Sequence, residues 1–459
     1  MFANSTVFRV VSFFYFNRIV GSFRFIRQQF YKSGLFRWFQ TLKLLIFWLK
    51  QRVIIIRQIS RLRKFVDFLE KELFAFKSKV NYYGISGWKP VFEAIGIICM
   101  AIVPVFKVWG WLILIPVAFL INLSGREKNQ NPLTVVSSFL WLALLISAVF
   151  SSSLNSGWLY LSRYGTYLIL FWLVGKFSPG YSRRLILYLV CSSLIWLVLG
   201  LLQQWAGIPT PSGWLSEEQS RVITLRVYSL FTNPNTYGLY LLSNLILVSF
   251  LLKEFTGYRR LFLIFIGFLT LLSLYLTYSR IAWILGTFFL IAKYWRNPAG
   301  KKWLIVGAFL LLLFALEALK ARSLPLLLWN DSSLRYRFRI WEGTIKAIAA
   351  FWLWGAGPGS FSKIYPWFQN GLTPADHSHQ LYLQLWLENG IFSLGVFIFW
   401  VKHFFQKISL VQGLGRSCMV IVIMFLGYGL FESWFESQLI SGYFWLFAGL
   451  TVSLNLAQN

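Results

Sequence analysis

Two histidines lie two residues apart at the start of a long apolar run. They are His377 and His379 in PADHSHQLYLQLWLENGIFSLG, and His403 is the third histidine of the chain. An imidazole with an unperturbed pKa of about 6.5 can accept a proton near neutral pH. These two residues are therefore the candidate catalytic groups, and Asp376 could orient either ring. The alternative is an interfacial pair that only forms hydrogen bonds.

Three polar residues follow the histidines at regular spacing. If a helix begins near His379, then Gln380, Gln384 and Glu388 recur every four residues and share one face. A polar stripe on an otherwise apolar helix normally faces a bundle interior or a water-filled cavity. We therefore expect this stripe to position a substrate.

Six arginines form a second candidate group. A planar guanidinium can donate two parallel hydrogen bonds to diphosphate oxygens. As a set they are predicted to hold an anionic ligand, whereas any one of them could equally contact lipid headgroups or snorkel. They are Arg221 and Arg226 before VYSLFTNPNTYG, Arg280 in LTYSRIAW, and Arg335, Arg337 and Arg339 in LRYRFRIW.

Two turn motifs add amide groups to the candidate site. Pro234 in TNPNTYG disfavours helix at Asn233, so Asn233 and Asn235 are predicted to cap the next helix or to offer amides to a ligand. In GAGPGSF, Gly357 and Gly359 could expose backbone amides to a phosphate. That turn lacks the Gly-Lys-Ser/Thr ending of a nucleotide-binding loop.

The elements that must position these residues are membrane helices. The chain is 57% hydrophobic with a mean hydropathy of +0.62, and apolar runs of about 20 residues recur along it. We predict an all-α polytopic membrane protein with about twelve transmembrane helices. The predicted spans are 91–106, 108–124, 133–150, 158–175, 185–204, 228–252, 261–279, 281–295, 303–319, 383–401, 417–432 and 438–455.

Basic residues in alternate loops predict the orientation of these spans. By the positive-inside rule they indicate a cytoplasmic N-terminus and place the loops 205–227 and 320–382 outside, the second between spans 9 and 10. The candidate arginines and histidines then face the exterior, and residues 341–354 read as an interfacial helix. The transmembrane domain is predicted over 91–459.

Residues 1–90 form a separate basic region. They hold 17 of the 44 basic residues, interleaved with Phe, Trp, Ile and Leu. This pattern is typical of a cytoplasmic or interfacial segment that contacts anionic lipid headgroups. Nucleic-acid binding is the alternative, but no recognisable reading motif accompanies the charge.

Five motifs in order resemble the O-antigen ligase/polymerase superfamily of bacterial envelope proteins. The resemblance covers about residues 220–400. It extends to a cyanobacterial branch described as inorganic-carbon transporters, which shares the asparagine-proline-asparagine, serine-arginine and glycine-turn motifs. The motifs are VYSLFTNPNTYGLYL, LTYSRIAWILG, RIWEGTIKAI, WGAGPGSF and HSHQLYLQLWLENGIFSLG.

The resemblance implies a metal-independent glycosyltransferase with a GT-C-like fold and no cofactor. Such an enzyme moves a glycan from a polyprenyl-diphosphate carrier to an acceptor glycan, lipid or protein on the external face of the bacterial inner membrane. The family's diphosphate-binding arginines correspond best to Arg226, Arg280 and Arg339. Its histidine corresponds to His379, and Gln380 stands where asparagine is usual. Polymerase, O-antigen ligase and protein O-glycosylating ligase all remain open, as does a bicarbonate or solute transporter that uses the arginines as an anion pathway.

Overall fold

The computed structural model describes residues 133–149, 154–211, 225–231, 233–294, 332–369, 371, 373–408 and 411–455, with four isolated positions at 95, 115, 116 and 118. The chain divides into two compact units, Met1–Phe74 and Ala75–Asn459, and all described residues belong to the second. Four predictions therefore lie outside the described residues: the basic region 1–90, most of the first two spans, the span 303–319, and the role of Arg221.

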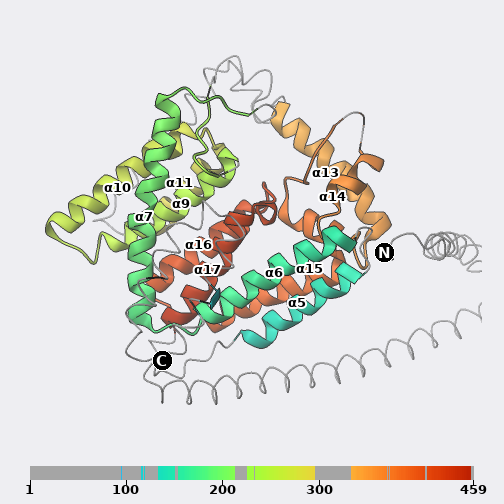
Figure 1. The fold of residues 1–459 in the computed structure, drawn as a ribbon, viewed down its shortest axis with the longest axis horizontal. Helices are drawn as coiled ribbons and strands as arrows, with labels where there is room; N and C mark the ends of the chain where they lie inside the picture. Colours follow the sequence, from blue (N-terminus) through green and yellow to red (C-terminus); the bar gives the residue numbers. More distant parts are fainter. Residues whose placement is uncertain are drawn as a thin grey trace, which may run out of the picture. The chain divides into compact units, whose positions relative to one another are not determined.

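Every regular element in the described ranges is a helix, as predicted (Figure 1). A short 3₁₀ turn accompanies two of the connections. The elements are α5 (Thr134–Val149), α6 (Leu154–Val174), α7 (Pro179–Trp205), α9 (Pro234–Leu251), α10 (Gly257–Leu276), α11 (Arg280–Tyr294), α13 (Ser332–Phe351), α14 (Phe361–Ile364), η4 (Tyr365–Trp367), α15 (Leu381–Lys407), α16 (Gly413–Tyr428), η5 (Trp434–Glu436) and α17 (Gln438–Asn455).

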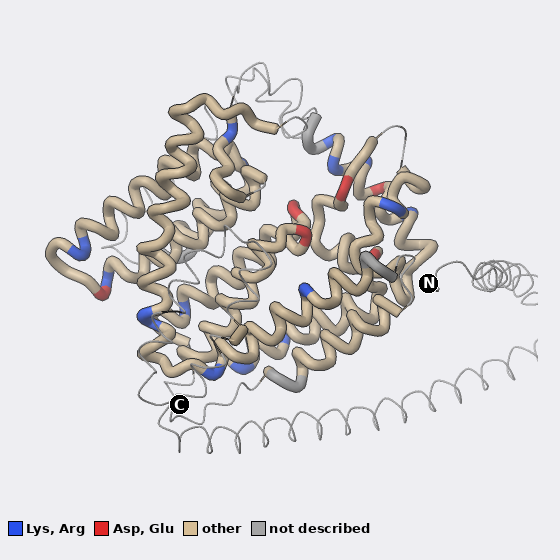
Figure 2. Tube along the Cα trace, viewed as in Figure 1, with Lys and Arg blue, Asp and Glu red and all other residues tan. Residues whose placement is uncertain are grey.

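The described helices indicate an integral membrane protein. Three of them, α7, α10 and α15, are long and apolar enough to cross a bilayer, and shorter apolar stretches lie in α5, α11 and α16. Most of the length of these helices carries no charged residue (Figure 2). Charges are costly in hydrocarbon, so this distribution is the one a bilayer selects. The total of twelve spans remains a prediction.

Helix α17 connects two packed groups of helices. It contacts α6, which packs with α5, and α5 contacts α15. It also contacts α16, which packs on α9 beside α10 and α11 (Figure 1).

Trp400 of α15 shows how the first group is held together. Its ring centroid lies 5.5 Å from that of Phe171 on α6 and 4.8 Å from that of Trp445 on α17. Its indole N–H donates to Ser137 Oγ of α5 at 3.0 Å. The indole buries a large apolar surface and leaves no unpaired N–H.

The helix ends differ from the predicted spans at three places that matter for the site. Helix α9 begins at Pro234 rather than 228. Helix α13 runs from Ser332 to Phe351, whereas the interfacial helix was predicted over 341–354, so the arginine segment lies within a helix. Helix α16 ends at Tyr428 rather than 432, and the peptide N–H groups of Phe431 and Glu432 donate to the Tyr428 carbonyl in a tight turn. Hydropathy missed this last end because the apolar sequence continues through the turn. Glu432 therefore lies in a loop and not in a span.

Helix α15 is broken at Gly390, and the glycine turn of GAGPGSF fills the break. Gly390 has φ 76°, which frees the carbonyls of the preceding turn. Those carbonyls are satisfied by the turn: Ala356 N–H donates to Leu387 O and Gly357 N–H to Glu388 O, both at 2.8 Å. A Cβ at Gly355 would lie 2.3 Å from Glu388 O. The glycines thus permit a close backbone contact between the turn and α15.

Candidate functional site

The histidine segment is held in a fixed conformation directly before α15. Gln380 caps the helix through its side chain, which accepts from Leu383 N–H. Ser378 Oγ donates to Gln380 O at 2.6 Å, and Ser378 N–H donates to Gln384 Oε1 at 2.7 Å. His379 has φ 52°, a left-handed conformation that is uncommon for a non-glycine residue. The helix thus begins after His379, and the two glutamines of the predicted stripe fix the loop that presents the imidazoles.

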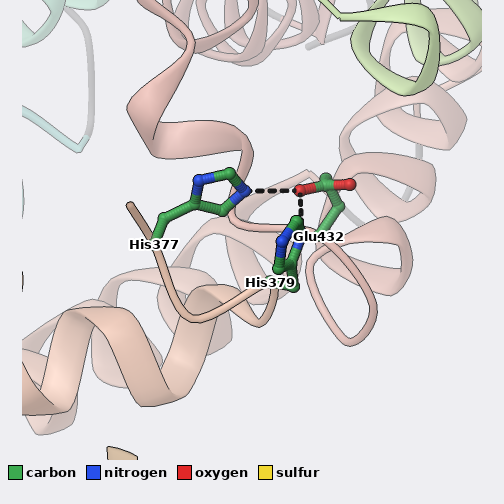
Figure 3. A group of neighbouring side chains, drawn as sticks. All are labelled: His377, His379 and Glu432. Carbon is green, nitrogen blue, oxygen red and sulfur yellow. Dashed lines mark hydrogen bonds and ion pairs between the residues drawn. The ribbon is translucent and has the colours of Figure 1, made fainter. Parts of the chain in front are cut away.

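Both imidazoles bond to one carboxylate (Figure 3). His377 Nε2 lies 3.0 Å and His379 Nδ1 3.1 Å from Glu432 Oε1, and the ring centroids are 4.1 Å apart. Glu432 is almost fully buried, whereas the two histidines keep partial exposure. Asp376, which the sequence suggested as the orienting group, is exposed. Sequence reasoning missed Glu432 because it was counted within the span 417–432. An acidic residue at the end of an apolar run was the available signal, since such residues are costly in a membrane.

Asn235 links this carboxylate to an arginine. Its Nδ2 donates to Glu432 Oε2 at 2.9 Å, and its Oδ1 accepts from Arg226 Nη2 at 3.0 Å. Arg226 Nε also donates to Thr277 O at 2.9 Å. Asn233 caps α9, as predicted, by accepting from Asn235 N–H at 2.7 Å. Local turn geometry at TNPNTYG therefore aims one amide at both the arginine and the carboxylate.

Arg337 rather than Arg339 points to the histidine cluster. Arg337 Nη2 lies 3.9 Å from Glu432 Oε2, and its side chain is 13% exposed. Residues two apart on a helix differ by about 200° around the axis, so Arg339 faces the other way and is exposed. Arg280, at the first position of α11, is half-buried and close enough to Arg226 for the two charges to repel.

The charges at the site depend on one another. Burial would raise the pKa of Glu432, but the two imidazoles outweigh burial and hold that pKa well below its usual range. Burial acts against protonation of His377, yet the bond to Glu432 outweighs it and raises the pKa of His377. At His379 burial dominates and lowers the pKa, with help from the charges of His377 and Arg337. Burial also lowers the pKa of Arg226 to about 10, which leaves it cationic at neutral pH.

The same three groups have the donor types of a metal site. Among the described residues, the ligand atoms of His377, His379 and Glu432 lie within 4.8 Å of one another, and imidazole nitrogen with carboxylate oxygen suits Zn²⁺. Two features favour an ion-paired hydrogen-bond cluster instead. Each imidazole already directs a nitrogen to the carboxylate, and Arg337 lies beside the same carboxylate. A guanidinium at that position repels a divalent cation.

A second polar cluster lies behind the histidine loop. Gln384 Nε2 donates to Glu388 Oε1 at 2.9 Å, so these two residues of the predicted stripe share one face, whereas Gln380 is the capping residue before the helix. Glu388 is buried and accepts from Phe361 N–H at 3.0 Å and from the Gly359 amide. The amides of Gly357 and Gly359 are thus directed to α15, and Glu388 anchors the glycine turn. Their predicted contact with substrate stays a prediction.

Comparison with known proteins finds a family match in the central part of the chain. Residues 265–398 match the O-antigen ligase family, a stretch that contains Arg280, Arg337, His377 and His379. Arg226, Asn235 and Glu432 lie outside the matched stretch. A search of curated proteins returned no match. The match indicates a membrane protein of glycosyl-transfer type that handles glycans, and it confirms the resemblance to the O-antigen ligase/polymerase superfamily over residues 265–398.

Proposed function

We propose that the chain is a membrane glycosyltransferase that moves a glycan from a polyprenyl-diphosphate carrier to an acceptor hydroxyl. The observation that carries the proposal is the pair of imidazoles bonded to one buried carboxylate beside Arg226 and Arg337. The arginines can bind an anionic leaving group, and an imidazole can accept a proton. A glycosyl transfer from a diphosphate needs both of these functions.

The arginines supply the diphosphate site. Arg226 is buried, Arg337 is largely buried, and Arg280 is half-buried. The charges of Arg280 and Arg337 both act on Arg226, so the three cations lie close to one another. When the bond between the anomeric carbon and the diphosphate oxygen breaks, the electron pair leaves with the diphosphate. Guanidinium groups stabilise that developing charge, and a site of low dielectric strengthens the effect.

His379 is the base in this reaction. The acceptor oxygen forms a bond to the anomeric carbon as its proton passes to the imidazole. His379 bonds Glu432 through Nδ1, so its Nε2 can face the acceptor. Its lowered pKa keeps the ring neutral, and therefore able to accept a proton, at neutral pH. Because diphosphate is a good leaving group, the reaction requires neither a general acid nor a metal ion.

The setting of the reaction follows from the predicted orientation. The positive-inside pattern supports a site that faces the periplasm from the bacterial inner membrane, with a cytoplasmic N-terminus. Partners are then the lipid-linked glycan, an acceptor glycan, lipid or protein, and anionic lipid headgroups at residues 1–90, with no nucleic acid. Polymerase, O-antigen ligase and protein glycosylating ligase share this chemistry and differ in the acceptor.

The glycan profile of the native host tests this function. We expect His379→Ala to remove long surface polysaccharide chains, or to accumulate the lipid-linked glycan, when compared with wild type at matched protein level. His403→Ala, a change at the distant end of α15, should leave the profile unchanged. An unchanged profile for His379→Ala would contradict the assignment of the base and favour the transporter alternative. Accumulation of long chains that are still attached to the lipid carrier would indicate a ligase. Loss of long chains would indicate a polymerase.

A further inference from the structure

We infer that Glu432 is a positioning residue that holds His379 as a neutral base while His377 balances its charge. The inference rests on the proposed function and adds that the two histidines have different roles, His379 as the base and His377 as the partner that balances the charge. It gives the active site a residue outside the stretch that matches the family.

The bonding pattern selects the ring nitrogens. A carboxylate accepts hydrogen bonds, so the nitrogen that faces it must carry hydrogen. His379 presents Nδ1 to Glu432 Oε1, which leaves the Nε2 lone pair of the neutral ring for the acceptor hydroxyl. A carboxylate that fixes a histidine tautomer in this way is the usual partner of a histidine base.

His377 completes the arrangement. It bonds the same oxygen through Nε2 at 3.0 Å, and this contact raises its pKa. When His377 is protonated it balances the charge of Glu432, and its own charge then lowers the pKa of the neighbouring His379. One carboxylate can therefore serve a charged imidazole and a neutral one together.

Burial argues that the carboxylate has more than a packing role. Glu432 is nearly inaccessible, and an ionised buried group is costly unless it is paired. Apolar replacements for buried ion pairs are often equally stable, so packing alone does not require charge here. Among the described residues, the charged or titratable groups around the cluster are Arg226, Arg280, Tyr336, Arg337, Asp376, Tyr428 and Glu436.

The rate of transfer as a function of pH tests the inference. The full-length protein, reconstituted with a polyprenyl-diphosphate-linked glycan, should lose activity at acid pH as the base becomes protonated. Glu432→Gln removes a charge that raises the pKa of His379, so the acid limb should move to lower pH. We expect kcat to fall about 10²–10⁴-fold, the range for a disturbed acid–base group, with a smaller change in the KM for donor.

His377→Gln should move the acid limb in the opposite direction, and it keeps the test available if Glu432→Gln does not fold. Loss of the neighbouring positive charge should raise the pKa of His379 and move the acid limb to higher pH. Glu342→Gln, which removes an exposed carboxylate paired with Lys346 on α13, is the control and should leave the profile unchanged.

Two results separate failure of the inference from failure of the function. Reduced rates with the acid limb in its wild-type position, in either folded variant, would mean that Glu432 or His377 is merely structural and would overturn the inference. Wild-type turnover by His379→Ala would remove the proposed base itself, whatever the two variants show. Shifts of the acid limb in opposite directions in Glu432→Gln and His377→Gln would support the different roles of the two histidines.

Discussion

At the scale of single residues, the site depends on where each charge points rather than on how many charges the sequence holds. Three arginines in LRYRFRIW looked equivalent in the sequence, yet helical geometry separates them. Arg337 faces the Glu432 carboxylate and Arg339 is exposed. The family resemblance pointed to Arg339, whereas the helix places Arg337, two residues earlier, at the cluster.

Replacement of each arginine distinguishes these two positions. A hydrogen bond between charged groups contributes about 1.5–3 kcal/mol, and about 1.4 kcal/mol corresponds to a factor of ten. We therefore expect Arg337→Ala to raise the KM for the lipid-linked donor about 10–100-fold, and Arg339→Ala to change it less than about threefold. Steady-state kinetics at a fixed acceptor concentration makes the comparison. A larger effect from Arg339→Ala would return the assignment to that residue.

The residues of the site were partly predictable. Residue type and motif order named the histidines, the asparagines and the arginines of this cluster as candidates. Glu432 was not, because it follows the histidines by more than fifty residues and ends an apolar run. Neither spacing nor composition indicates that an acid so far along the sequence will contact both imidazoles in the folded chain. The start of α15 contacts the end of α16: Leu381 N–H donates to Gly429 O at 2.7 Å and Tyr382 Oη donates to Leu426 O at 2.8 Å, which brings Glu432 to the histidines.

At the scale of elements, the break in α15 explains how the histidine loop is supported. The glycine turn inserts its N–H groups into the break, and Glu388 bonds the peptide after the turn. Gln384 then connects this cluster to Ser378 between the two histidines. Helix, turn and loop therefore form one hydrogen-bonded unit.

Gly390→Ala should disrupt that unit. Its Cβ would lie 2.2 Å from Leu353 O, and φ is positive, so we expect a loss of about 2 kcal/mol or more in the free energy of unfolding. Gly395→Ala in the same helix is the matched control, because its Cβ would meet nothing within 4 Å. Thermal unfolding in detergent, followed by tryptophan fluorescence, compares the two. Equal midpoints for both variants would contradict this account of the break.

Apolar runs predicted the existence of these helices well and their ends poorly. Nine predicted spans overlap with described helices. Errors occurred where backbone turns have apolar sequences, as after Tyr428, or where a helix begins in a polar segment, as at Ser332. Hydropathy reports the cost of leaving water and is insensitive to the hydrogen bonds that end a helix.

At the scale of the whole molecule, the site is assembled from segments far apart in the sequence. Arg226 and Asn235 precede the matched stretch, the histidines lie near its end, and Glu432 follows it. The hydrogen bonds within a helix join residues only a few positions apart. A site made of residues far apart in the sequence therefore requires the complete arrangement of α9, α11, α13, α15 and α16. The sequence predicted the membrane class through composition, but this convergence depends on tertiary packing.

The central claim is that His379 acts as the base in a metal-independent glycan transfer. It is tested most directly by turnover of purified full-length protein with a polyprenyl-diphosphate-linked glycan and an acceptor, in excess chelator. We predict that wild type and His403→Ala retain full rates with chelator present, and that His379→Ala loses about 10²–10⁴-fold in kcat. A His379→Ala protein that turns over at the wild-type rate, or a wild-type rate abolished by chelator and restored by a divalent metal, would contradict the account.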